Sequence, residues 1–185
     1  TEEEKETKEA ETEETEDTNT NSDVELAPYP YTQRTPRISI ETPKDYMSIN
    51  QGYVQMFNVG RDKSISLVTH LDHTSTSLED AHDAAFEEYI QGFSAYASIV
   101  ALTAEKEEVI DVNGREMYHF EGELNCSYND VEYDLYCTGY SFIMDDIPCM
   151  LIGTVLEKER PQEMVDEIKM YTDAMIQTVR HRDEE

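Results

Sequence analysis

The stretch that decides the fold is Val109-Ile110-Asp111-Val112-Asn113-Gly114-Arg115-Glu116-Met117-Tyr118-His119-Phe120. Its central Asn-Gly dipeptide lies between two runs rich in β-branched and aromatic residues, which is the strongest short-range indication of a β-hairpin. Asn129-Asp130 suggests the next reversal of the chain, and Asp145-Asp146-Ile147-Pro148 suggests the third. The three reversals predict a four-stranded antiparallel meander from about Ile99 to Leu156.

Two strands and one helix are predicted directly before this meander. The strands cover about residues 53–58 and 63–71, and Gly60 between them supplies the positive φ of a turn. Ser77 begins a helix that extends to about residue 95, with Asp80 three residues later in the position of a capping-box acid. The helix has an apolar stripe opposite an acidic face, formed by Leu78, Ala81, Ala85, Tyr89 and Phe93 against Glu79, Asp83, Glu87 and Glu88.

The sequence pattern also indicates where the folded region begins and where it ends. An extended, proline-containing lead-in over residues 24–35 precedes a strand at Arg37–Glu41. Pro161 suits the first turn of a helix near residues 161–181, because its missing N–H would have no partner there. Three basic residues at positions 180–182 then meet the negative end of the helix dipole. The order β-β-β-α-β-β-β-β-α predicts the α+β class, with a twisted antiparallel sheet flanked by helices.

The stretch Arg37-Ile38-Ser39-Ile40-Glu41-Thr42-Pro43-Lys44-Asp45-Tyr46 resembles the opening of the PsbP-like domains, in which a strand is followed by Pro, a turn and an aromatic residue. The later elements are similar to that family's order over about residues 37–182. The resemblance implies an α/β/α sandwich and a place in the family's bacterial lipoprotein branch. It carries over no catalytic residues, because the members share a scaffold rather than an enzymatic residue set. Tyr46 stands where many members have Trp, a residue that this chain lacks.

The first 23 residues differ sharply from the rest of the chain. They contain nine Glu, two Asp, two Lys, six Thr and one apolar residue, Ala10. Such a segment buries too little to offset the backbone entropy of ordering, about 1–2 kcal/mol per residue, and is expected to be disordered. We therefore predict a disordered acidic linker and extended lead-in over residues 1–34, followed by one PsbP-like domain over residues 35–185.

Acidity extends beyond this segment. Residues 1–23 hold 11 of the 42 acidic and 2 of the 14 basic residues, so residues 24–185 keep 31 acidic and 12 basic ones, a net charge of −19. Like-charge repulsion argues against nucleic acid or anionic lipid as a partner and favours a protein or surface polymer that is cationic. The alternative is that the charge only maintains solubility.

The acidic segment also suggests where the protein works. A disordered acidic N-terminus beginning at Thr1 is what remains when a lipoprotein is cut just after its acylated Cys. We expect an extracellular protein on a bacterial cell surface, attached to the membrane only through an N-terminal lipid. Fully extended, residues 1–23 would span at most about 80 Å, which holds an acidic domain clear of the negative membrane surface. The alternatives are a secreted protein with an acidic tail and a cytoplasmic one with an interaction tail.

One face of the meander is a candidate ligand-binding surface. If Asn129-Asp130 is a two-residue turn, acidic residues and tyrosines share this face while the opposite face is core. Acids beside tyrosines suit a cationic or sugar-like ligand, since Tyr offers an apolar ring and a hydroxyl. The alternative is a solvated face whose Tyr rings pack on a helix. The candidate residues are Glu121, Glu123, Asp134, Tyr136 and Tyr140, with Thr138 among them.

A second cluster lies where a strand ends and the first predicted helix begins. Imidazoles and carboxylates at such a junction could bind a divalent metal, although their spacing matches no zinc motif. The alternative is a set of solvated polar residues in a connection. The candidates are His70, Asp72, His73 and His82, and a metal-dependent or small-molecule enzyme using the His70–Asp83 junction is the rival to a non-enzymatic binding domain.

The three cysteines are expected to be structural thiols. Cys126, Cys137 and Cys149 are an odd number and none forms a C-x-x-C pair. The expected register also places Cys126 and Cys137 four residues out of step, too far apart for a disulfide. The sequence contains no G-x-S-x-G, P-loop or dinucleotide fingerprint. We therefore predict no cofactor and no catalytic residue.

Overall fold

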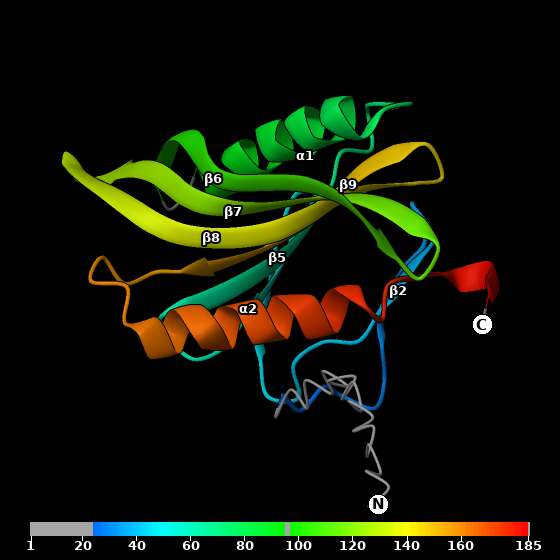
Figure 1. Cartoon of the computed structure of the whole chain (residues 1–185), viewed down its shortest axis with the longest axis horizontal. Helices are drawn as coiled ribbons and strands as arrows, with labels where there is room; N and C mark the ends of the chain where they lie inside the picture. Colours follow the sequence, from blue (N-terminus) through cyan, green and yellow to red (C-terminus); the bar gives the residue numbers. More distant parts are fainter. Residues whose placement is uncertain (1–23, 95–96, 185) are drawn as a thin grey trace, which may run out of the picture.

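The computed structural model describes residues 24–94 and 97–184, so the predicted disorder of residues 1–23 lies outside the described residues. The largest element is a seven-stranded antiparallel sheet in the order β3-β4-β5-β9-β8-β7-β6, of which Figure 1 labels β5 to β9. Its strands are β3 (Met47–Gln51), β4 (Val54–Asn58), β5 (Lys63–Thr69), β6 (Ser98–Val112), β7 (Arg115–Tyr128), β8 (Val131–Met144) and β9 (Ile147–Val155).

The predicted meander is confirmed as β6 to β9. Its three connections are two-residue turns in which both residues have positive φ, from 50° at Asn129 to 81° at Gly114. Gly, Asn and Asp tolerate that conformation better than other residues, and its twist matches that of the flanking strands. Three short polar dipeptides thereby fix the register of the four strands, which is the central feature of the α+β fold.

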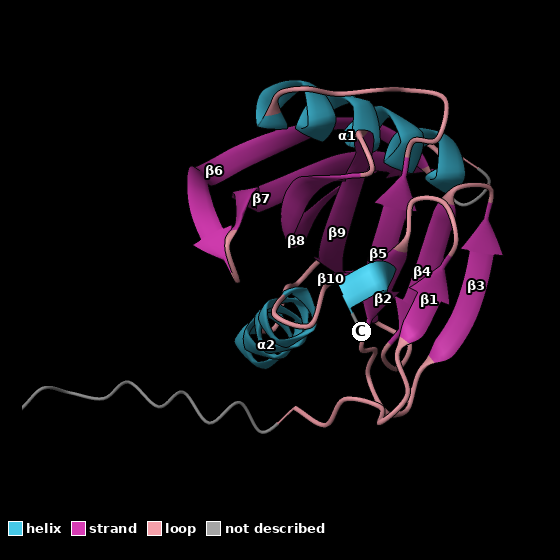
Figure 2. Ribbon diagram, turned by 90° about the vertical axis from the view of Figure 1, so that its right-hand side faces the viewer, coloured by secondary structure: helices cyan, strands magenta, loops and turns pink. Residues whose placement is uncertain are grey.

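Two helices cover opposite faces of this sheet (Figure 2). The first, α1 (Leu78–Phe93), packs over a core that includes Val54, Phe120 and Ile152. The second, α2 (Gln162–Ile176), packs over a core that includes Phe57, Phe142 and Leu151. The alternating side chains of the central strands are therefore buried on both faces, which produces the sandwich that the sequence predicts.

The strand predicted at Arg37–Glu41 forms, but outside the main sheet. It is β2 (Ile38–Ile40), the centre of a small sheet with β1 (Tyr31–Gln33) and β10 (Arg180–His181). Ile38 and Ile40 are fully buried in the core beneath α2. Since β1 lies within the lead-in assigned to residues 24–35, the paired part of the chain begins before residue 35. β1 pairs with the adjacent β2, with Tyr31 opposite Ile40 and Gln33 opposite Ile38, in a stretch whose neighbouring prolines indicate an unpaired lead-in.

The second helix is shorter than predicted. It ends at Ile176, and the chain then forms β10 and a 3₁₀ helix at Arg182–Glu184. Thr178 Oγ1 donates to Met175 O and accepts from Glu41 N, which turns the chain toward β2. Of the basic residues expected beside the helix dipole, Arg180 and His181 therefore form β10 instead, and Arg182 begins the 3₁₀ helix.

Strand β3 was missed because Met47-Ser48-Ile49-Asn50-Gln51 is mostly polar. It lies at one edge of the main sheet, where Met47 is 60% exposed, and it pairs only with β4 among the described strands. The other edge is β6, a strand that carries several charged residues and two register irregularities against β7. The two edges of the sheet thus differ in charge as well as in length.

Helix α1 begins where the sequence predicts, but one residue of its predicted acidic face is buried. Ser77 caps the helix by accepting a hydrogen bond from Asp80 N at 3.2 Å. The Asp80 carboxylate contacts His73 Nε2 at 3.2 Å. Glu88, expected on the solvent side, is buried with its Oε2 3.8 Å from His70 Nδ1. β5 and the turn that follows it, which carries His70, contact this side of α1.

Candidate functional site beside helix α1

The structure brings the predicted acid–tyrosine face together. Glu123 pairs with Tyr136 across β7 and β8, and Asn125 pairs with Asp134, so these side chains share one face as expected. This face lies toward α2 and the loop that precedes it. Tyr136 and Tyr140 are both nearly buried there, in the core beneath α2.

The acidic groups of this face have partners within the protein. Glu121 binds Lys169 Nζ of α2 at 2.9 Å and accepts a hydrogen bond from Tyr136 at 3.0 Å. Although burial alone would raise it, these bonds hold the pKa of Glu121 below its usual range. Arg160 Nη1 binds Glu123 at 2.6 Å, and both Nε and Nη2 of Arg160 donate to Asp134 O. A ligand at this face would have to displace these contacts, and its binding role stays a prediction.

A tyrosine of this face also fastens the second helix to the sheet. Tyr140 donates a hydrogen bond to Asp173 Oδ1 of α2 at 2.6 Å. Burial raises the pKa of Tyr136 and of Tyr140, so both phenols remain neutral donors at physiological pH. The tyrosines therefore pack beneath α2 in a face that is buried at these positions rather than solvated, and Glu121 and Glu123 beside them form ion pairs within the protein.

The histidine cluster is only partly assembled. The rings of His70 and His73 are 5.6 Å apart, while Asp72 is exposed on the turn between them. His82 lies elsewhere, on the buried side of α1, with Nδ1 2.9 Å from Ser141 Oγ. Within residues 24–94 and 97–184, no group of three or more His, Cys, Asp or Glu side chains is placed to hold a metal ion.

The three cysteines are free and buried, in line with structural thiols. Cys137 pairs with Gly122 and Cys126 pairs with Tyr133, so the two are four residues out of step, as predicted. Burial raises the pKa of all three thiols. Each therefore remains a thiol rather than a thiolate near neutral pH.

An acidic groove that the sequence analysis missed runs between α1 and β6. Three carboxylates border it: Glu79 and Asp83 lie one turn apart on α1, and Glu107 lies on β6. All three are exposed, and none has a Lys or Arg partner among the described ion pairs. Phe86 and Tyr118 are among the residues that line the groove between them. We call this surface the α1–β6 groove.

The negative charges of this groove affect the pKa values of two residues that line it, Tyr118 and His82. Burial, a hydrogen bond with Glu107 and the charges of Glu79 and Asp83 raise the pKa of Tyr118 to about 12. Burial lowers the pKa of His82, whose ring lies 4.8 Å from that of Tyr118, although Asp83 and Glu107 oppose the shift. A positive charge entering the groove would gain from three carboxylates and from aromatic faces.

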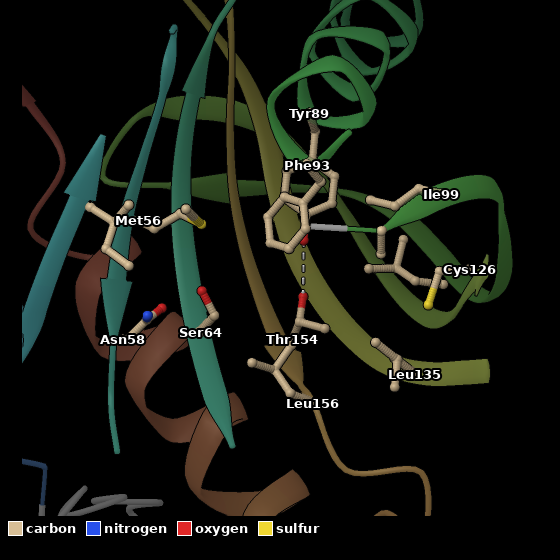
Figure 3. A pocket seen from close by; sticks show the side chains of 13 residues that line it. Met56, Asn58, Ser64, Tyr89, Phe93, Ile99, Cys126, Leu135, Thr154 and Leu156 are labelled. Carbon is tan, nitrogen blue, oxygen red and sulfur yellow. Dashed lines mark hydrogen bonds between the residues drawn. The ribbon is translucent and has the colours of Figure 1, made fainter. Parts of the chain in front are cut away.

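A second feature beside α1 is an apolar pocket of about 230 Å³ between the C-terminal end of the helix and the sheet (Figure 3). Tyr89 and Phe93 of α1 form one wall, and the other lining residues come from strands β3 to β9, from Ala97 and from Leu156. The described lining includes no charged side chain. Its residues are Ile49, Met56, Asn58, Ser64, Tyr89, Phe93, Ala97, Ile99, Leu124, Cys126, Leu135, Thr154 and Leu156.

Neither the groove nor the pocket could be located from local pattern. The i, i+4 spacing of Glu79 and Asp83 was visible, but nothing in the sequence placed β6 beside α1. The residues that line the pocket are spread between positions 49 and 156. Most are isolated apolar residues in strands, and in the sequence they cannot be distinguished from other core residues. Both sites form only when distant segments pack together, so no short stretch of sequence indicates them.

Comparison with solved structures shows the fold. The structure of cyanobacterial PsbP (CyanoP) from Synechocystis sp. PCC 6803 matches with a TM-score of 0.52 and 13% identity, covering 80% of this chain and 90% of that one. The Ran-binding protein Mog1p of Saccharomyces cerevisiae matches with a TM-score of 0.55 and 10% identity, covering 87% and 97%. No protein-family model matches the sequence, and no curated protein does. The chain therefore has a PsbP-like fold.

Proposed function

We propose that this protein is a non-enzymatic binding domain, held at a bacterial cell surface by an N-terminal lipid, whose partner is a positively charged protein or surface polymer. The α1–β6 groove carries the proposal. Its three carboxylates lack Lys or Arg partners among the described residues, whereas the acids of the β7–β8 face are bound by Lys169 and Arg160. Mog1p, one of the solved structures that share this fold, is titled a Ran-binding protein, which supports a role in binding another protein.

The charge of the whole molecule supports the same partner. Residues 24–185 have a net charge of −19, which attracts a polycation and speeds its encounter with the domain. The groove would then supply specificity, because Phe86 and Tyr118 offer aromatic surface to the side chain of Arg or Lys. Binding should weaken as salt is added, since exposed charges are screened over about 10 Å at 0.1 M salt.

A labelled oligo-arginine peptide tests the groove directly. We expect the triple variant Glu79→Gln, Asp83→Asn, Glu107→Gln to bind it at least about ten times more weakly than the natural chain, through loss of three favourable charge contacts. The matched control is Glu132→Gln, Glu159→Gln, Glu163→Gln, which removes the same charge from exposed positions outside the groove. Equal losses in the two variants would show that only the general field binds the peptide and would reject the groove.

Surface display is tested separately. The acidic composition of residues 1–23 and the resemblance to bacterial lipoproteins support it. We expect the precursor to carry an export signal and a lipid-modified Cys upstream of the acidic segment, and the mature protein to incorporate labelled palmitate. An upstream sequence without an apolar export segment, or one without that Cys, would remove the anchor and leave the groove proposal standing.

The rival hypothesis of a metal-dependent enzyme at the His70–Asp83 junction makes a different prediction. A transition metal present in equal amount with the purified protein, and lost from a His70→Gln, His73→Gln variant, would favour the enzyme and overturn the binding proposal. The separation of His82 from the other two histidines is the observation that speaks against such a centre.

A further inference from the structure

The apolar pocket under the C-terminal end of α1 contains one polar group that its surroundings leave unsatisfied. Ser64 is 2% exposed, and its Oγ has no hydrogen-bond partner among the described residues. A hydroxyl buried in this way loses its bonds to water without replacement, which destabilises the fold. Figure 3 shows Ser64 on the pocket wall, together with Thr154 and the aromatic rings of α1.

A second polar pair lies close by and is weakly bonded. Tyr89 Oη and Thr154 Oγ1 are 3.4 Å apart, longer than the usual spacing of about 2.7–2.8 Å between hydroxyl oxygens. Burial raises the pKa of Tyr89, so its hydroxyl remains a neutral donor. The pocket thus combines a large apolar wall with three hydroxyls, those of Ser64, Tyr89 and Thr154, that can form further hydrogen bonds. That is the usual composition of a small-molecule site.

The size and charge of the pocket restrict what can occupy it. An engineered apolar cavity of about 150 Å³ takes benzene, so 230 Å³ suits a molecule of about ten non-hydrogen atoms. No charged side chain lines the pocket among the described residues, so an ionised group would lose its hydration without compensation. Leu156 is 38% exposed and Asn58 is partly exposed, which places both at the mouth of the pocket.

We propose that this pocket binds a neutral, mostly aromatic small molecule of bicyclic size, with one hydrogen-bonding group directed at Ser64 Oγ. The site is separate from the α1–β6 groove, whose lining residues it does not share. The ligand would satisfy the Ser64 hydroxyl and fill the space between α1 and the strands. A bound ligand of this kind stabilises the fold in proportion to its concentration.

Indole and indene provide a matched pair of probes, because they have nearly the same shape and only indole carries an N–H. We expect the full chain to bind both, and indole more tightly. Ser64→Ala should weaken indole binding by about 2- to 12-fold, the range for one neutral hydrogen bond, and leave indene binding unchanged. Since the chain has no Trp, indole fluorescence can be followed without a tryptophan background.

Chemical protection gives a readout that does not depend on a variant. Cys126 lines the pocket, while Cys137 and Cys149 are fully buried outside its lining. Bound indole should slow the alkylation of Cys126 by N-ethylmaleimide, measured by peptide mapping, with Cys137 and Cys149 as internal references. Cys126→Phe should fill the space and abolish binding of both probes.

Three results would overturn the proposal: no saturable binding of either probe, equal loss of indole and indene affinity in Ser64→Ala, or unchanged alkylation of Cys126 at saturating indole. The triple groove variant is the control that separates this proposal from the preceding one. It should keep its full affinity for indole while it loses affinity for oligo-arginine.

Discussion

At the scale of single residues, Asp145 joins three segments that are distant in sequence. Its carboxylate accepts hydrogen bonds from Arg37 N at 2.8 Å and from Arg37 Nη2 and His181 Nε2 at 3.0 Å each. The Arg37 guanidinium and amide hold the pKa of Asp145 far below its ordinary value of 3.8, and His181 adds to the effect. The β8–β9 turn is thereby attached to β2 and β10.

We expect Asp145→Asn to lower the free energy of unfolding by about 1.5–3 kcal/mol at neutral pH, the range for hydrogen bonds to a charged group. Because the folded-state pKa is depressed, the stabilisation is complete above the unfolded-state pKa and is lost as the pH falls through and below 3.8. Urea unfolding at a series of pH values should therefore show the two proteins converging in acid. Asp146→Asn, in the same turn and exposed, is the control and should cost less than about 0.5 kcal/mol. A difference that persists unchanged to pH 2 would contradict this account.

At the scale of elements, the contact between α2 and β9 depends on Gly153. A Cβ at this position would lie 2.3 Å from Thr172 Oγ1 and 3.0 Å from Ile168 Cγ1, both on the buried face of α2. We expect Gly153→Ala to destabilise the protein by about 1–3 kcal/mol, the usual cost of overpacking a core. In a Thr172→Ala background the same substitution should cost less, because the nearest atom is gone. Thermal unfolding of the four proteins in a double-mutant cycle measures that coupling, and additive effects would show that α2 shifts as a rigid body instead.

The elements also show which parts of the fold were predictable. The three turns of the meander depend on dipeptides such as Asn113-Gly114, whose conformational preference is local, and they were predicted at the right residues. Strands β3 and β10 were not, because Met47–Gln51 is polar and Arg180–His181 continues a helical pattern until it meets β2. Ser64 illustrates the same limit for a site: its significance comes from the lack of a partner, which only the assembled strands and α1 reveal.

At the scale of the whole molecule, self-repulsion among acidic residues opposes the compact state. With a net charge of −19 on residues 24–185, screening should stabilise the fold. Raising NaCl from about 0.1 M to 1 M shortens the screening length from about 10 Å to about 3 Å. We expect the melting temperature to rise by about 2–8 °C, which corresponds to roughly 1–2 kcal/mol for a domain of this size.

The triple groove variant provides the comparison for this prediction. It carries three fewer negative charges, so it should melt higher than the natural chain at low salt and respond less to added NaCl. A melting temperature that falls with salt would mean that attractive pairs such as Arg160–Glu123 outweigh the repulsion.

The unequal edges of the seven-stranded sheet have a consequence for the colloidal behaviour of concentrated protein. Charged residues and two register irregularities protect β6 from pairing with another chain, whereas Met47–Gln51 has no charged side chain to do so. At low ionic strength, long-range repulsion between the acidic bodies keeps two β3 edges apart. Salt that strengthens the individual fold removes this barrier, so conditions that raise the melting temperature should also lower the solubility, with self-association beginning at β3.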